Sequence, residues 1–116
     1  MIIVHGNIPL KPDCREDALR LARAMATATQ NEEGCVSYDF YIGLGDPNTL
    51  LVFQEWENMD ALMGHFQTKH MKSFLDELPS LVSGEIVTRR YAVQTMEEGD
   101  QASQEKQEVE APRVIH

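Results

Sequence analysis

Apolar and polar side chains alternate along the first residues of the chain. Over residues 2–8 the two sides carry different side chains: Ile2, Val4 and Ile8 on one, Ile3, His5 and Asn7 on the other. A period of two predicts a β-strand. Residues 35–42 alternate in the same way, and further strands are predicted at 49–56 and 85–93. The loop between the strands predicted at 35–42 and 49–56 consists of turn-forming residues, so these two strands are predicted to form a hairpin.

Two segments between these strands repeat apolar residues at helical spacing. The first carries a narrow stripe of mostly small residues, suited to lying on a sheet: Ala18, Leu21, Ala22, Met25 and Thr29. Asp13 is predicted to cap this helix, with Glu16 reaching back to the cap, and Gly34 to end the connection after it. Asn58 is predicted to cap the second helical region, which is interrupted and then continues from a fresh cap at Thr68.

The order of these elements predicts an α+β domain of the ferredoxin-like type, β-α-β-β-α-β, with both helices on one face of an antiparallel sheet. The other face also carries apolar and aromatic side chains, and a second copy of the sheet would cover it in a symmetric dimer. From residue 94 the chain becomes acidic and loses its apolar periodicity. We therefore expect one domain over 1–93 and a disordered tail over 94–116, with a short partner-pairing strand at Val114–Ile115 as the alternative.

Composition narrows the class of partner. The 116 residues carry 19 acidic and 10 basic side chains, a net charge of −9, which argues against nucleic acid as a partner. No apolar run reaches the roughly 18 residues that a membrane helix needs. The first residues lack a charged leader, and Cys14 and Cys35 form no C-x-x-C pair. These features predict a cytoplasmic protein with reduced thiols and no membrane association.

Two histidines are the main candidates for chemistry. His65 and His70 flank the interruption in the second helical region. A kink there would let both point into one cleft, where histidine can move a proton near neutral pH. The alternative is a pair of ordinary half-exposed histidines at helix ends. A zinc or iron site would need a third ligand, such as Glu55 or Asp39, and the spacing of five is no established ligand pair, so we expect no metal.

Strand positions supply candidate binding residues. Asn7 and Tyr38 are polar or amphipathic groups where half-burial is expected, and a buried Asn must be hydrogen-bonded to protein or ligand. Trp56, the single tryptophan, suits either core packing or ligand contact. Only one of the neighbouring Arg89 and Arg90 can face inward. No phosphate loop, nucleophile elbow, or flavin or nicotinamide fingerprint is present, so no cofactor is expected.

The motifs together resemble one known family. The run 51–58 (LVFQEWEN), then Ala61-Leu62, then 65–74 (HFQTKHMKSF), resembles the antibiotic biosynthesis monooxygenase domain family, and 33–39 (EGCVSYD) resembles its second strand. The resemblance covers about 1–93 and is greatest to the quinol-monooxygenase-like subgroup.

This resemblance implies a dimeric α/β-barrel of two ferredoxin-like protomers, each with a pocket between its helices and its sheet. It also implies a cofactor-independent monooxygenase whose partners are a small quinol or polycyclic phenol and O₂. On this hypothesis His65 or His70 is the catalytic base, with His65 the first choice. The residues expected to hold or enclose the substrate are Asn7, Tyr38, Phe53, Trp56, Phe66 and Arg90.

Other branches of the family leave alternatives. The haem-degrading branch resembles this chain at Asn7, but the positions of its helix Trp and His fall on His65 and Leu75, which argues against haem degradation. A sugar-phosphate isomerase of the autoinducer type would need a phosphate-binding cation: Arg89, Arg90 or Lys69. A binding module without catalysis is the third alternative, because a fold does not determine a function.

Overall fold

The computed structural model describes residues 1–94 and residue 96. Its elements, in chain order, are β1 (Ile2–Pro9), the 3₁₀ turn η1 (Pro12–Cys14), α1 (Arg15–Gln30), β2 (Cys35–Gly43), β3 (Asp46–Trp56), α2 (Met59–Phe66), α3 (Lys69–Glu77), the 3₁₀ turn η2 (Leu78–Ser80) and β4 (Val87–Ala92). The predicted tail and its candidate strand at Val114–Ile115 lie, except for Gln94 and Met96, outside the described residues.

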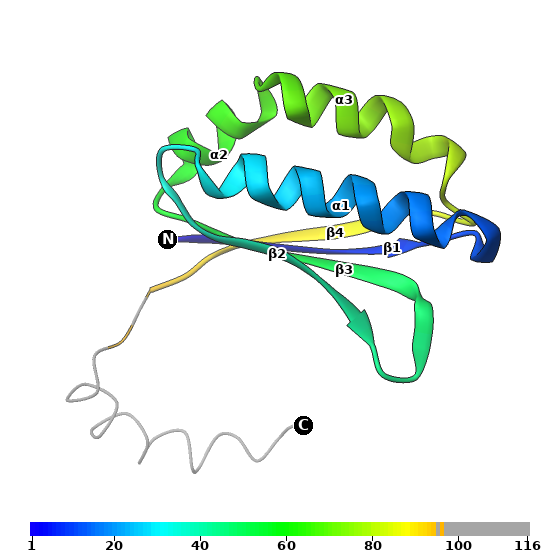
Figure 1. The fold of residues 1–116 in the computed structure, drawn as a ribbon. Helices are drawn as coiled ribbons and strands as arrows, with labels where there is room; N and C mark the ends of the chain where they lie inside the picture. Colours follow the sequence, from blue (N-terminus) through cyan, green and yellow to red (C-terminus); the bar gives the residue numbers. More distant parts are fainter. Residues whose placement is uncertain (95, 97–116) are drawn as a thin grey trace, which may run out of the picture.

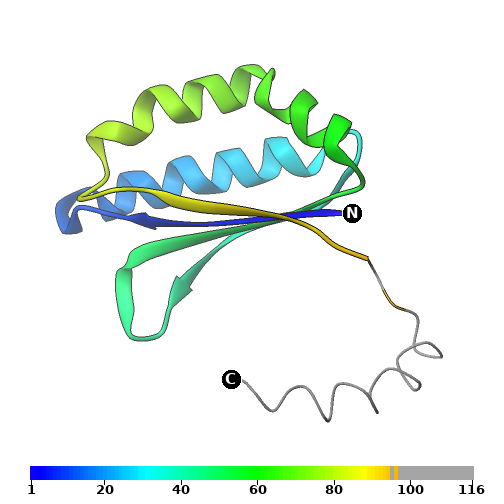
Figure 2. The same ribbon diagram turned by 180° about the vertical axis from the view of Figure 1, so that it is seen from behind.

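The strands form one antiparallel sheet in the order β2-β3-β1-β4. Figures 1 and 2 show α1 and the α2–α3 pair on the same side of this sheet, while the β2–β3 hairpin curls away from the helices. This is the predicted ferredoxin-like arrangement, with the second helical region divided into two helices. No helix in the described part of the chain is both long and apolar enough to cross a membrane.

The start of α1 differs from the prediction. Asp13 does not cap the helix, because Pro12 opens a 3₁₀ turn that contains Asp13. A capping residue needs a backbone outside the helix, and Asp13 already lies within a helical turn. Cys14 takes the cap position before Arg15, and its side chain makes no capping hydrogen bond.

The break between α2 and α3 is built as predicted. Asn58 caps α2 by accepting the backbone N–H of Ala61 at 2.9 Å. Thr68 caps α3 by accepting the N–H of Met71 at 3.2 Å, and its hydroxyl donates to the carbonyl of His65 at 2.8 Å. One threonine therefore joins the last turn of α2 to the first turn of α3, which sets the relative positions of His65 and His70.

The core lies between the helices and one face of the sheet. In β1 the core residues are the three that alternation placed on one side of the strand. The neighbouring strands β2 and β3 add further core residues, and together the strands contribute Ile2, Val4, Ile8, Tyr38, Leu50, Val52 and Trp56. From α1 it takes small or slender side chains: Ala18, Ala22, Met25, Ala26 and Thr29. Small side chains let the helix approach the sheet closely.

The opposite face of the sheet carries no helix. The strand register places Ile3, His5 and Asn7 of β1 on it, opposite Glu55, Phe53 and Leu51 of β3. On the outer strands Tyr41, Val87 and Tyr91 of this face are exposed. Asn7 and Phe53, which the resemblance places around the pocket, thus lie on the side of the sheet away from the helices.

Candidate functional site

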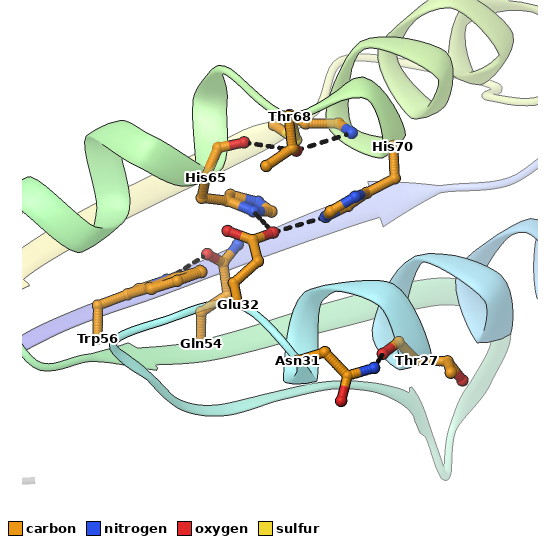
Figure 3. A network of polar contacts seen from close by, with 9 residues as sticks. Thr27, Asn31, Glu32, Gln54, Trp56, His65, Thr68 and His70 are labelled. Carbon is orange, nitrogen blue, oxygen red and sulfur yellow. Dashed lines mark hydrogen bonds and ion pairs between the residues drawn. The ribbon is translucent and has the colours of Figure 1, made fainter.

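Glu32 brings the two predicted histidines together. Its Oε2 lies 2.8 Å from Nδ1 of His65 and 2.5 Å from Nε2 of His70, so one carboxylate oxygen contacts both rings (Figure 3). The His65 side chain is fully buried, that of Glu32 is 13% exposed and that of His70 29%. The break was predicted to let both histidines point into one cleft. Both contact Glu32, but neither lines the cleft next to it and His65 is buried. Glu32 is the residue that the sequence analysis missed.

The turn between α1 and β2 positions Glu32. The backbone N–H of Glu32 donates to the carbonyl of Thr29 at 2.9 Å. Asn31 Nδ2 donates to the carbonyl of Thr27 at 3.1 Å (Figure 3). Gly34 follows with φ +84°, a backbone conformation that residues other than glycine rarely adopt. Its carbonyl accepts the N–H of Glu57 at 2.9 Å, which ties the turn to the residues before α2.

Aromatic rings surround His65. The ring centroid of Trp56 lies 4.9 Å from that of His65, Tyr38 lies at 5.6 Å and Phe66 at 5.9 Å. Trp56 is itself held by a hydrogen bond from its Nε1 to Gln54 Oε1 at 2.9 Å, in the buried layer beneath the histidine. This site is therefore a histidine in an apolar pocket with a carboxylate at one edge.

Burial controls the protonation of His65 and Tyr38. Burial lowers the pKa of His65 below its ordinary value, although the hydrogen bond and charge of Glu32 act in the opposite direction. Burial, reinforced by the charge of Glu32, also raises the pKa of Tyr38, so this hydroxyl keeps its proton near neutral pH. A neutral imidazole next to an ionised carboxylate donates the proton of the facing nitrogen. Nδ1 of His65 therefore carries the proton, and Nε2 presents a lone pair.

The second nitrogen of His65 has no partner. Nε2 is buried and makes no hydrogen bond to any described residue. A buried polar atom without a partner is uncommon and costs free energy, so such atoms are often found where a ligand or proton is exchanged. Held by Glu32 through Nδ1 and basic at Nε2, His65 has the arrangement of a general base with an orienting carboxylate.

The structure gathers most of the predicted site residues on the helix-facing side of the sheet. Tyr38, Trp56 and Phe66 surround His65, and the exposed Arg90 places its guanidinium carbon 5.7 Å from the Phe66 ring centroid. Asn7 and Phe53 are not brought to this cluster, for the reason of strand parity given above. Arg89 lies on their face, paired across from His5.

The third ligands considered for a metal lie elsewhere. Glu55 accepts a hydrogen bond from Ser37 at 2.7 Å on the face without helices, and Asp39 lies exposed on that face, opposite Phe53. Glu32 instead supplies an oxygen to the two histidines, and among the described residues these three ligand atoms lie within 4.8 Å of one another. The sequence offered one signal for Glu32. It is a carboxylate directly before the Glu33-Gly34 motif, and this turn lies at the end of the sheet where the second helical region begins.

A cleft of about 490 Å³ adjoins the site on the side of Glu32. It lies between the turn after α1 and the start of α2. Its charged lining residues are all acidic: Glu32, Glu33, Glu57 and Asp60. Four carboxylates repel anions, so this cleft does not suit a phosphate group.

Comparison with known proteins agrees with the fold and the motifs. The family model described as antibiotic biosynthesis monooxygenase matches residues 1–77, and the chain belongs to this family. Over 82 residues it is 38% identical to the uncharacterized protein sll1783 of Synechocystis, covering 71% of this chain and 56% of that protein's length. It is 30% identical over 83 residues to "Putative monooxygenase YcnE" of Bacillus subtilis, covering 72% and 87% of the two chains.

A third relative is similar in both sequence and structure. "Putative monooxygenase Rv0793" of Mycobacterium tuberculosis is 33% identical over 102 residues, which cover 88% of this chain and 95% of that one. Its solved structure superimposes with a TM-score of 0.77 at 25% identity, covering 82% and 96% of the two chains. The ferredoxin-like fold of this chain is thus that of its family.

Proposed function

We propose that this chain is a cofactor-independent monooxygenase that oxidises a quinol or polycyclic phenol with O₂. One observation carries the proposal: His65 is buried among aromatic rings, with Nδ1 held by Glu32 and Nε2 free of any partner among the described residues. Family membership supports the reaction class, because two relatives carry the names "Putative monooxygenase YcnE" and "Putative monooxygenase Rv0793".

The proposed reaction begins with a proton transfer. Nε2 of His65 takes the proton of a phenolic hydroxyl, and Glu32 stabilises the imidazolium from the Nδ1 side. The resulting oxyanion is electron-rich enough to reduce O₂. For a quinol, one oxygen atom enters the ring to give a hydroxyquinone and the other leaves as water. Atoms and electrons balance without an external reductant.

The substrate would reach His65 from the side of Phe66. Nε2 is covered in the free protein, and Phe66, 40% exposed, is the most exposed of the rings around it. Displacement of Phe66 would open the aromatic pocket, and Arg90 beside it would face the developing oxyanion. The pocket then excludes water from a reactive intermediate.

The isomerase alternative receives less support from the site. It needs a cation for phosphate. Of its candidates, Arg90 lies beside Phe66 on the side of the site, but Arg89 lies on the other face of the sheet. The cleft beside Glu32 is lined with carboxylates, which repel phosphate. The non-catalytic alternative predicts affinity for a ligand without turnover. It is distinguished from the oxygenase by the assay below.

We further propose that the chain forms a homodimer through the sheet face without helices. That face leaves Tyr41, Val87 and Tyr91 exposed, and a four-stranded sheet with apolar groups on both faces gains stability from a second cover. Light scattering at micromolar concentration should give twice the chain mass of 13.2 kDa. A monomer at that concentration would exclude the barrel.

Oxygen uptake with freshly reduced quinols, corrected for autoxidation, tests the reaction. We expect uptake above background that falls about 10²-fold or more in His65→Gln, the range a general base contributes. His5→Gln is the control, because His5 lies on the opposite face and stacks on Tyr91; light scattering should first show that its assembly is unchanged. Equal turnover in His65→Gln would reject the base, and ligand binding without uptake across the panel would favour the binding module.

A further inference from the structure

We propose that Glu32, His65 and His70 form a binding site for one divalent first-row transition-metal ion. The three ligand atoms are Glu32 Oε2, His65 Nδ1 and His70 Nε2, and all lie within 4.8 Å of one another. Two histidines and one carboxylate are a ligand set that zinc and non-haem iron both accept. The inference depends on this geometry and goes beyond the proposed oxygenase function.

An ion requires all three ligand atoms to shift. The two ring nitrogens, which lie within 4.8 Å of each other, move closer together, and the Glu32 oxygen moves away from both. Tetrahedral ligands at about 2.0–2.2 Å from zinc lie about 3.3 Å from one another. The Glu32 oxygen is now 2.8 Å and 2.5 Å from the two nitrogens, because each contact is a hydrogen bond. An ion that replaced the two protons would therefore move this oxygen by roughly 0.5–0.8 Å from each ring. A carboxylate in a turn, 13% exposed, can move that far.

Charge and access favour a cation at this position. His70 is 29% exposed, so one side of the cluster faces solvent and leaves a coordination position for water. The acidic cleft shares Glu32 with the cluster, and its other carboxylates, Glu33, Glu57 and Asp60, line the approach. The four carboxylates of the cleft raise the local concentration of cations there.

The site should bind an exchangeable ion rather than a permanent one. An ion on Nδ1 of His65 leaves the ring proton on Nε2, which has no hydrogen-bond partner among the described residues. Metal-bound histidines usually donate this second N–H, and loss of such a partner weakens binding about 10–100-fold. If the proposed function also holds, the same tautomer removes the basic lone pair, and the ion inhibits turnover reversibly.

Direct binding to the full chain, freed of tags and treated with EDTA, tests this inference. We expect Co²⁺ to give the visible absorption of a histidine-ligated ion and Zn²⁺ to bind by calorimetry at one ion per chain. Glu32→Gln and His70→Asn should each weaken binding at least 10-fold. Asp39→Asn, an exposed carboxylate on the face of the sheet without helices, should change it by less than about 2-fold.

Two results would overturn the inference: no saturable Co²⁺ or Zn²⁺ binding by the wild type, or binding that survives in His70→Asn while Glu33→Gln and Asp60→Asn abolish it. The second result would indicate diffuse attraction by the acidic cleft. Because the measurement needs no substrate, a protein that binds the ion but consumes no oxygen would refute only the proposed function. An oxygenase that binds no ion would refute only the metal site.

Discussion

Replacing Glu32 by glutamine removes the negative charge between the two histidines while keeping the shape of the side chain. The carboxylate accepts hydrogen bonds from both rings and is only 13% exposed. A charge-assisted hydrogen bond contributes about 1.5–3 kcal/mol and a neutral one about 0.5–1.5 kcal/mol. Over two bonds, the exchange should lower the free energy of unfolding by about 2 kcal/mol.

The same substitution should lower turnover more than it lowers substrate affinity. The glutamine oxygen can still accept the Nδ1–H of His65, but without the negative charge the imidazolium formed in the reaction is no longer stabilised. General bases contribute about 10²–10⁴-fold, so we expect kcat to fall by about 10²-fold with a smaller change in KM.

Urea denaturation and oxygen uptake of Glu32→Gln measure both effects. Glu33→Gln is the matched control, because it removes one charge from the adjacent exposed position and should stay within about 0.5 kcal/mol of wild type. If Glu32→Gln unfolds at the same urea concentration as Glu33→Gln and keeps full turnover, the bridging carboxylate has no role in the site and the reasoning is refuted.

Three further predictions test the elements around the site. Gly34→Ala should lower the free energy of unfolding, measured by urea denaturation, by at least about 2 kcal/mol, because φ is +84° and a Cβ would lie 2.4 Å from that of Ala61. Gly45→Ala, with open space around it, is the control, and an equal loss in both variants would contradict this reasoning. Thr68→Ala should lower stability by about 1 kcal/mol and reduce turnover, since it removes the cap between α2 and α3; a stability equal to wild type would show that the cap is dispensable. Burial lowers the pKa of His65 from its ordinary 6.5, so below that pH the unfolded chain binds a proton that the folded chain does not. The stability that this residue contributes is full above about pH 6.5 and falls below it by at most ~1.4 kcal/mol per unit, a slope that urea denaturation at several pH values should find reduced in His65→Gln.

The element pattern could be predicted from the sequence because it depends on neighbours along the chain. Alternation marked β1, and the hydrogen bonds that Asn58 and Thr68 form lie within three residues. The prediction that Asp13 caps α1 was wrong for an equally local reason. The preceding Pro12 starts a 3₁₀ turn, so Asp13 already lies within a helical turn and cannot act as the cap. The break that positions His65 and His70 was thus visible in the sequence.

Only the tertiary structure could join these histidines to Glu32. The contacts span 33 and 38 residues of sequence, and they exist because the turn at Gly34 packs against α2. The same packing decides which sheet face carries the helices. Alternation in the sequence placed Asn7 and Ile2 on opposite faces of β1. Only the packing of α1 and the α2–α3 pair on one of these faces determined that Asn7 lies away from the site. Local hydrogen bonds and periodicity are encoded in neighbouring residues, whereas the site depends on contacts between segments that meet only when the core is buried.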